Sequence, residues 1–140
     1  MRQLIIARKD LAMSPGKLSV QVAHASMAFL SNWIRNHMDL DGKVEGWLDD
    51  YTKEWIEGIF TKTVCEAKNK NQLLKAVEKA QELGFREGDD FFLINDNCLT
   101  ELEPEEVGAD GIGRTLTCIG FRPLPDDIAH DISKKYQLYK

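Results

Sequence analysis

Residues 4–35 read LIIARKDLAMSPGKLSVQVAHASMAFLSNWIR, and this stretch decides the fold class of the chain. The apolar, β-branched run Leu4–Ala7 predicts a short buried strand, and a polar loop follows it. Ser14 followed by Pro15 is typical of a helix start, because serine caps the first free N–H groups and proline fits the first turn. The stretch therefore predicts a strand, a loop and a helix that extends to about Arg35.

The predicted helix carries two apolar stripes on roughly opposite sides. At about 100° per residue, one stripe consists of Leu18, Val22, Ala25 and Phe29. The other consists of Val20, Ala23, Met27, Leu30 and Ile34. We expect a helix that is apolar on two sides to be buried on both. Between the stripes lies a polar edge that either faces water or forms a functional site, with Lys17, Gln21 and His24.

The remaining elements follow from similar patterns. We expect a second helix over Val44–Ile56, which contains Trp47 and Trp55 and carries aromatic residues at helical spacing. Further predicted elements are a strand at Phe60–Ala67, a helix at Gln72–Leu83 capped by Asn71, strands at Phe91–Asn95 and Arg114–Gly120, and a helix at Asp126–Tyr136. This order predicts a single α/β domain over residues 1–140, a three-layer sandwich with a small four-stranded mixed sheet flanked by helices.

Composition limits the setting in which the protein works. The chain has 140 residues, of which 43% are hydrophobic, enough for one domain with a real core. It has three cysteines without close spacing, which favours a reducing, cytoplasmic setting over a disulfide framework. No run of about 18 apolar residues and no signal peptide is seen, so we expect no membrane span.

Charge is distributed unevenly along the chain. The formal net charge is -5, which counts against a nucleic-acid ligand, because such ligands are bound by lysine and arginine. The charged residues among the first 35 are nevertheless mostly basic, and the acidic residues of the chain concentrate at 39–57 and 87–110. The overall charge alone therefore does not exclude an RNA substrate.

A lysine and an aspartate offer the strongest candidate chemistry. Lys17 lies in the first turn of the predicted helix, and Asp96 lies just past a predicted strand, where loops of α/β folds collect functional groups. Thr100 and Thr115 could supply hydroxyl groups to either. If the two charged groups meet, the carboxylate can take a proton from water and the ammonium can stabilise an oxyanion, which suits ester hydrolysis. The alternative is an ordinary ion pair that holds the helix to the sheet.

Other chemistry has weaker support in the sequence. A Cys98 nucleophile with His24 as its base is conceivable, although nothing places that histidine against the sulfur. The histidines are scattered and form no Cys/His pair with metal-ligand spacing, so we expect no metal site.

Motifs across nearly the whole chain resemble the type 2 peptidyl-tRNA hydrolase family. Residues 8–25 match its N-terminal signature of Arg-x-Asp-Leu-x-Met, then Gly-Lys, then Gln-x-x-His-Ala. Residues 96–101 are similar to its Asp-Ala-Gly-x-Thr-Glu motif, and residues 115–121 to its Thr-Val-Leu-x-Ile-Gly-Pro strand. The ending at 136–139 is similar to the terminal Leu-Lys-Leu-Tyr of the family.

The resemblance implies hydrolysis of the ester between a peptide and the terminal ribose of its tRNA, in translation in the cytoplasm, with no metal or organic cofactor. It also implies a four-stranded mixed sheet and a possible homodimer. The residues on which catalysis would fall are Lys17, Asp96, Thr100 and Thr115. Gln21 and His24 match the helix motif and would have supporting roles, either orienting side chains or binding the substrate at the acceptor end of the tRNA.

Three positions differ from the family pattern. Asn97-Cys98 replaces Ala-Gly after the aspartate, Phe121-Arg122 replaces the usual proline, and residues 103–113 form a longer, acidic loop. Glycine often marks a backbone conformation that other residues adopt only at a cost. The acidic loop and the aromatic 44–56 segment motivate two alternatives: a non-catalytic relative that acts as a protein-binding module, or a hydrolase of a different ester or amide.

Overall fold

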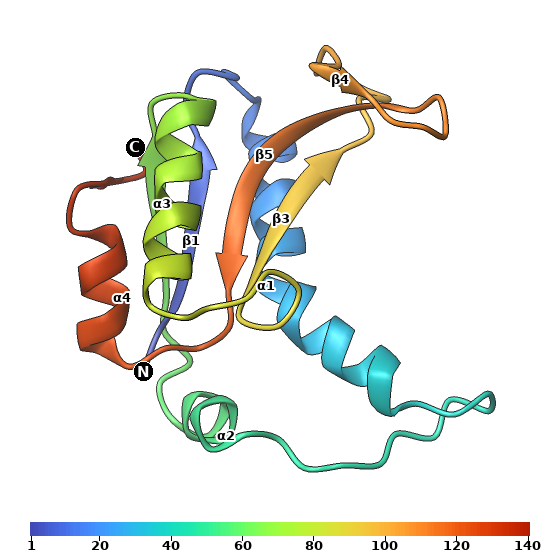
Figure 1. The fold of residues 1–140 in the computed structure, drawn as a ribbon, viewed down its shortest axis with the longest axis vertical. Coiled ribbons are helices and arrows are strands. Elements are labelled where there is room, and N and C mark those ends of the chain that lie inside the picture. The colour runs from blue at the N-terminus through green and yellow to red at the C-terminus, as the bar shows by residue number, and fades with distance from the viewer.

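A mixed β-sheet forms the centre of the molecule, with helices on both faces (Figure 1), in a computed structural model that describes residues 1–140. The long strands are β1 (Gln3–Arg8), β2 (Lys62–Ala67), β3 (Phe91–Asp96) and β5 (Gly113–Phe121). Two strands of two residues each complete the sheet, β4 (Glu106–Val107) and β6 (Gln137–Leu138). The α/β sandwich is confirmed; the four predicted strands are the long ones, and the two short ones were not expected.

The strand order and directions bring the carboxyl ends of three strands to one edge of the sheet. The order is β3-β5-β1-β2-β6, with β4 paired to β5. β1 and β3 both run antiparallel to β5, and β2 runs parallel to β1. β1, β2 and β3 therefore all end at the same edge, where Asp96 is the last residue of β3.

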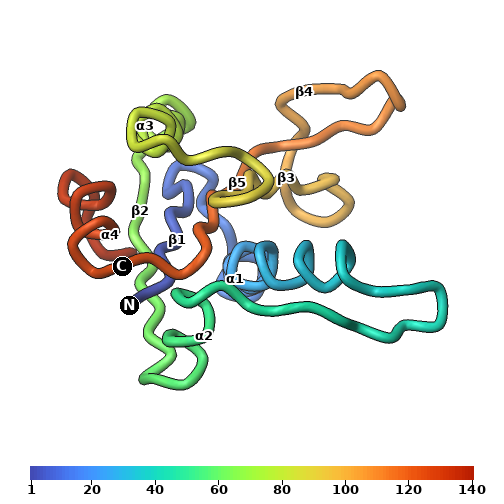
Figure 2. Tube along the Cα trace, turned by 60° about the horizontal axis from the view of Figure 1, so that its bottom comes forward, coloured from blue at the N-terminus to red at the C-terminus, as the bar shows by residue number.

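The helices are divided between the two faces of the sheet (Figures 1 and 2). α1 (Pro15–His37) covers one face, whereas α3 (Lys70–Glu82) and α4 (Asp126–Ser133) cover the other. α2 (Asp50–Glu57) lies at the edge opposite the ends of β1, β2 and β3. Side chains of β1 point alternately to the two faces of the sheet. Leu4 and Ile6 pack in the larger core cluster with α3 and α4, whereas Ile5 and Ala7 pack in a smaller cluster with α1. No helix is both long enough and apolar enough to cross a membrane.

α1 begins as predicted and lies very close to the sheet. The Ser14 hydroxyl accepts a hydrogen bond from the Lys17 backbone N–H, at 3.2 Å, and Pro15 is the first helical residue. A Cβ atom on Gly120 of β5 would lie 2.2 Å from the carbonyl oxygen of Ala25, so only glycine allows this approach. At Ala25, α1 therefore packs directly on β5.

Burial of α1 on two sides was a wrong prediction. Ala25 and Phe29 face the sheet and are buried, but Val20 and Met27 of the second stripe are 50% and 52% exposed. Around Val20 and Met27, α1 is the outermost layer on its side of the sheet; only its second half lies against the 48–52 segment and α2. An apolar stripe shows that a surface could be buried, but only the layer order decides whether something lies over it.

The predicted helix over residues 44–56 is also corrected. α2 begins only at Asp50, because Asp49 caps it: its carboxylate accepts from the Thr52 backbone N–H at 3.0 Å and from the Thr52 hydroxyl at 2.6 Å. Before the cap, Gly46 has a φ of +145°, which is incompatible with a right-handed helix. Trp47 therefore lies outside the helix and is 93% exposed.

Two other helix ends differ from the prediction by a few residues. α3 is capped by Asn69, whose side chain accepts from the Gln72 backbone N–H at 2.9 Å, and Asn71 lies inside the helix. The predicted stop after α3 is confirmed, since Gly84 follows it with a φ of +84°. α4 ends at Ser133 rather than at Tyr136.

Candidate active site

Lys17 and Asp96 meet at the edge of the sheet. The Lys17 ammonium lies 2.8 Å from the Asp96 carboxylate oxygen Oδ1, and the two side chains are 12% and 13% exposed. One residue comes from the first turn of α1 and the other from the end of β3, so packing of α1 on the sheet brings them together. The pair is screened from bulk water but remains accessible at the surface, where it can meet a substrate.

The Lys17 ammonium has a second partner in the turn after β3. Its Nζ donates to the hydroxyl of Thr100, at 3.0 Å. An ammonium group carries three hydrogens, and these two bonds use two of them. One donor hydrogen of Lys17 is therefore left for another acceptor.

Gln21 joins the pair from one turn further along α1. Its Nε2 donates to Asp96 Oδ1 at 3.2 Å, and its Oε1 accepts from the hydroxyl of Thr117 at 2.7 Å. Gln21 is 1% exposed, so these two bonds decide which end of its amide faces Asp96. Thr117 thus holds the donor end of Gln21 toward the carboxylate.

Sequence reasoning missed Thr117 because a β-bulge determines where its side chain lies. In the β3–β5 pairing, Ile94 is opposite Cys118 but Asn95 is opposite Leu116, so Thr117 is the extra residue. Regular alternation would direct Thr117 and Cys118 to opposite faces. With the bulge, both contact Gln21 on the α1 side of the sheet.

The turn after β3 closes on the Asp96 carboxylate. The backbone N–H of Cys98 donates to Asp96 Oδ2 at 3.0 Å, which is the only bond to that oxygen. Cys98 has a φ of +59°, a left-handed conformation, at the position where the Asp-Ala-Gly motif has glycine. The turn therefore forms in this chain although cysteine adopts this conformation at a cost.

Thr115 and His24 do not contact the Lys17–Asp96 pair through hydrogen bonds. Thr115 is 1% exposed; its hydroxyl donates to the carbonyl oxygen of Glu103 at 2.6 Å and accepts from the backbone N–H of Glu105 at 3.1 Å. It also lies 3.4 Å from the Cys98 sulfur, so it joins the Asp96 turn to the acidic segment. His24 is exposed on the same edge of α1 and makes no side-chain hydrogen bond.

A second link joins the turn to the start of α1. The Glu101 carboxylate accepts from the Ser14 hydroxyl at 2.6 Å and from the Ser14 backbone N–H at 2.9 Å. These bonds favour the ionised form and lower the pKa of Glu101. Glu101 therefore ties the segment that carries Thr100 to the helix that carries Lys17.

The acidic segment 103–113 is largely neutralised by basic partners. Arg8, whose side chain is only 3% exposed, pairs with Glu105 at 2.5 Å and with Asp10 at 2.8 Å. The Arg8 guanidinium lowers the pKa of Glu105. Two further acids in the segment also have partners: Glu106 with Lys70 at 2.9 Å, and Asp110 with Arg114 at 2.6 Å. The repulsion of phosphates expected from this segment is correspondingly reduced.

The α/β sandwich brings a lysine–aspartate pair together at one edge of its mixed sheet. No group of three or more His, Cys, Asp or Glu side chains lies close enough to hold a metal ion. The model of the PTH2 family, described as peptidyl-tRNA hydrolase PTH2, matches residues 1–139. The chain belongs to this family.

Individual relatives agree with the family match. A peptidyl-tRNA hydrolase of Methanopyrus kandleri is 41% identical over 123 residues, which cover 87% of this chain and 84% of that protein. Proteins of the same name from Thermococcus onnurineus and Saccharolobus islandicus are 28% and 26% identical over 137 residues. These two alignments each cover 98% of this chain, and 96% and 98% of the relatives.

Proposed function

We propose that this chain hydrolyses the ester bond of peptidyl-tRNA at the Lys17–Asp96 pair, releasing peptide and tRNA. Family membership supports the activity, and one observation supports the site. The 2.8 Å ion pair leaves one donor hydrogen of Lys17 and one lone-pair position of Asp96 Oδ2 unused. A site that binds both a water and a developing oxyanion needs a free acceptor position for the water and a free donor hydrogen for the oxyanion.

In the proposed reaction, a water bound at Asp96 Oδ2 attacks the ester carbonyl carbon while the carboxylate takes its proton. The carbonyl oxygen becomes an oxyanion, which the remaining donor hydrogen of Lys17 stabilises. The bond between the carbonyl carbon and the ribose oxygen then breaks. Asp96 returns the proton to the leaving ribose oxygen. The products are a peptide with a free carboxyl group and a tRNA with a free hydroxyl.

The neighbouring residues have distinct proposed roles. Thr100 orients the Lys17 ammonium, and Gln21 holds Asp96 through the same carboxylate oxygen that Lys17 contacts, beside the acceptor end of the tRNA. Thr115, for which the resemblance implies a catalytic role, would act by fixing the turn that carries Asp96. His24 is exposed on the same edge of α1, and we propose that it contacts the acceptor end of the tRNA.

Cleavage of peptidyl-tRNA by the wild type and two site variants tests this proposal. Asp96→Asn keeps the shape but removes the base, and we expect kcat to fall by about 10²- to 10⁴-fold. Lys17→Met removes the oxyanion donor, with an expected loss of about 10²- to 10³-fold. Lys53→Met is the matched control, since Lys53 pairs only with Glu57 on the exposed surface of α2. Equal rates for the wild type and both site variants would exclude this pair as the active site.

We also propose that the protein acts in the cytoplasm and forms a homodimer. All three cysteines are free, which suits a reducing compartment, and Val20 and Met27 offer exposed apolar surface on α1. Sedimentation velocity should give about twice the 15.9 kDa mass of one chain, whereas a single species at that mass would contradict the dimer.

A further inference from the structure

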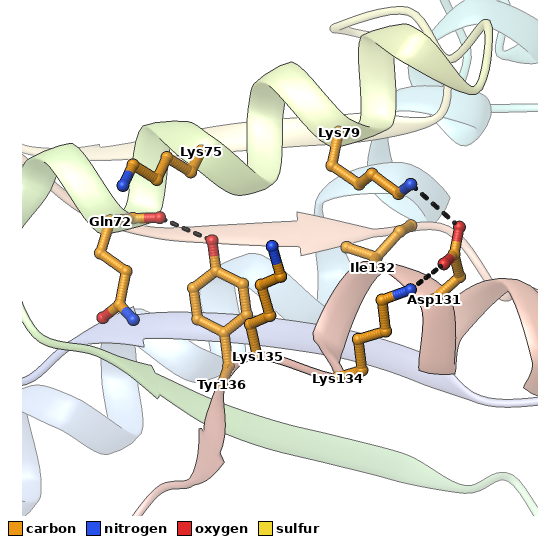
Figure 3. A pocket seen from close by; sticks show the side chains of 8 residues that line it. All are labelled: Gln72, Lys75, Lys79, Asp131, Ile132, Lys134, Lys135 and Tyr136. Carbon is orange, nitrogen blue, oxygen red and sulfur yellow. Dashed lines mark hydrogen bonds and ion pairs between the residues drawn. The ribbon is translucent and has the colours of Figure 1, made fainter.

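A lysine-rich groove lies between α3 and α4, on the face of the sheet opposite α1 (Figure 3). Its volume is about 370 Å³, and its only carboxylate is that of Asp131. Tyr136 lies in the groove, where its hydroxyl donates to the backbone carbonyl oxygen of Gln72 at 2.6 Å. The four lysines come from both walls: Lys75, Lys79, Lys134 and Lys135.

Two of these lysines have no acidic partner. Asp131 lies 3.2 Å from Lys79 and 3.0 Å from Lys134, and these contacts lower the pKa of its carboxyl group. Lys75 and Lys135 make no ion pair and no side-chain hydrogen bond. Lys135 extends toward α3 in the groove (Figure 3). In a chain with a net charge of -5, the groove thus has two lysine charges without an ion-pair partner.

The groove continues toward the edge of the sheet that holds the active site. Lys135 and Gln72 also line a second hollow of about 100 Å³, together with Glu66, Lys68 and Gln137. Lys68 directly follows β2, which ends at the same edge as β3. Three strand spacings separate β2 from β3, which corresponds to about 15 Å between Lys68 and Asp96 along that edge.

We propose that this groove binds backbone phosphates of the tRNA, away from the ester that is cleaved. The inference rests on the proposed function, because that function requires an acidic protein to hold a polyanion. Lysine ammonium groups on flexible stems bind phosphate as point charges and do not read base identity. Such a contact suits an enzyme whose substrates share a backbone but differ in sequence.

Reversing the two unpaired charges tests the proposal. In Lys75→Glu/Lys135→Glu, tRNA affinity at low salt should fall by about tenfold, and the slope of log affinity against log salt should decrease by about 2. The control is Lys43→Glu/Lys53→Glu, which has the same net charge but changes lysines outside the groove, both of them exposed and paired with glutamates. Binding is measured with deacylated tRNA, so this result does not depend on ester hydrolysis.

Two substrates then separate this contact from the active site. The groove variant should lose about tenfold in kcat/KM on peptidyl-tRNA but none on a short peptidyl ester of the terminal adenosine, which has no backbone to reach the groove. Asp96→Asn should lose activity on both substrates and keep its tRNA affinity. Equal tRNA affinity and salt slope for the groove variant and the wild type would overturn the groove proposal alone. An equal loss in the groove variant and the control would also overturn it, since net charge would then explain the effect.

Discussion

Replacing Thr117 with valine removes one hydroxyl from the network behind Asp96. Thr117 is fully buried, and its hydroxyl donates to Gln21 Oε1 at 2.7 Å. Valine has a similar shape but leaves Gln21 Oε1 buried without a donor. An unsatisfied buried acceptor costs about 1–3 kcal/mol, so we expect the free energy of unfolding to fall by about that amount.

The same substitution should slow catalysis without weakening substrate binding. Once the Gln21 amide is no longer held, Asp96 Oδ1 loses a fixed donor that lies 3.2 Å away. A less well positioned Asp96 should raise the activation free energy by about 1.4 kcal/mol, which corresponds to about a tenfold fall in kcat. KM should stay within about twofold, because the buried Thr117 cannot touch the substrate.

Urea unfolding and steady-state cleavage of peptidyl-tRNA measure the two effects of Thr117→Val separately. Thr117→Ser is the matched control, since it keeps the hydroxyl and should keep most of kcat. A Thr117→Val enzyme with wild-type kcat would refute the argument that Thr117 positions Gln21. A rise in KM at constant kcat would also refute it, since the effect would then lie in substrate binding.

Two further predictions concern the turn after β3 and the acidic segment. Cys98→Gly removes a left-handed strain of about 1–2 kcal/mol and adds about 0.5–1 kcal/mol of glycine entropy, so urea unfolding should show a small net gain in stability; a clear loss would contradict this. Arg8 lowers the pKa of Glu105 below its ordinary 4.5, so the ion pair stabilises the fold fully above about pH 4.5 and is lost as the pH falls through the folded-state pKa. Glu105→Gln should therefore have a lower Tm than the wild type at pH 7, and this difference should shrink as the pH is lowered below about 4.5. A difference independent of pH would exclude the ion pair as its cause.

Local sequence determined the long strands, three of the four helices and the residues that meet at the candidate site, apart from Thr117. Ser14 and Pro15 specify the start of α1 because capping depends only on adjacent residues. The apolar run of β1 and the glycine after α3 act in the same local way. Lys17 and Asp96 were identified from motifs in separate segments, which give residue types and spacing but no distance between side chains.

Tertiary structure alone decided how those parts contact one another. Lys17 reaches Asp96, 79 residues further along the chain, because α1 packs on the sheet, and Gly120 allows that packing at Ala25. Thr117 joins the site through a bulge, which depends on how β5 pairs with β3 and not on its own alternation. Val20 and Met27 on the outer stripe of α1 are exposed because no further layer covers that part of the helix. Each of these outcomes depends on packing between distant segments, and a periodic pattern within one segment does not contain that information.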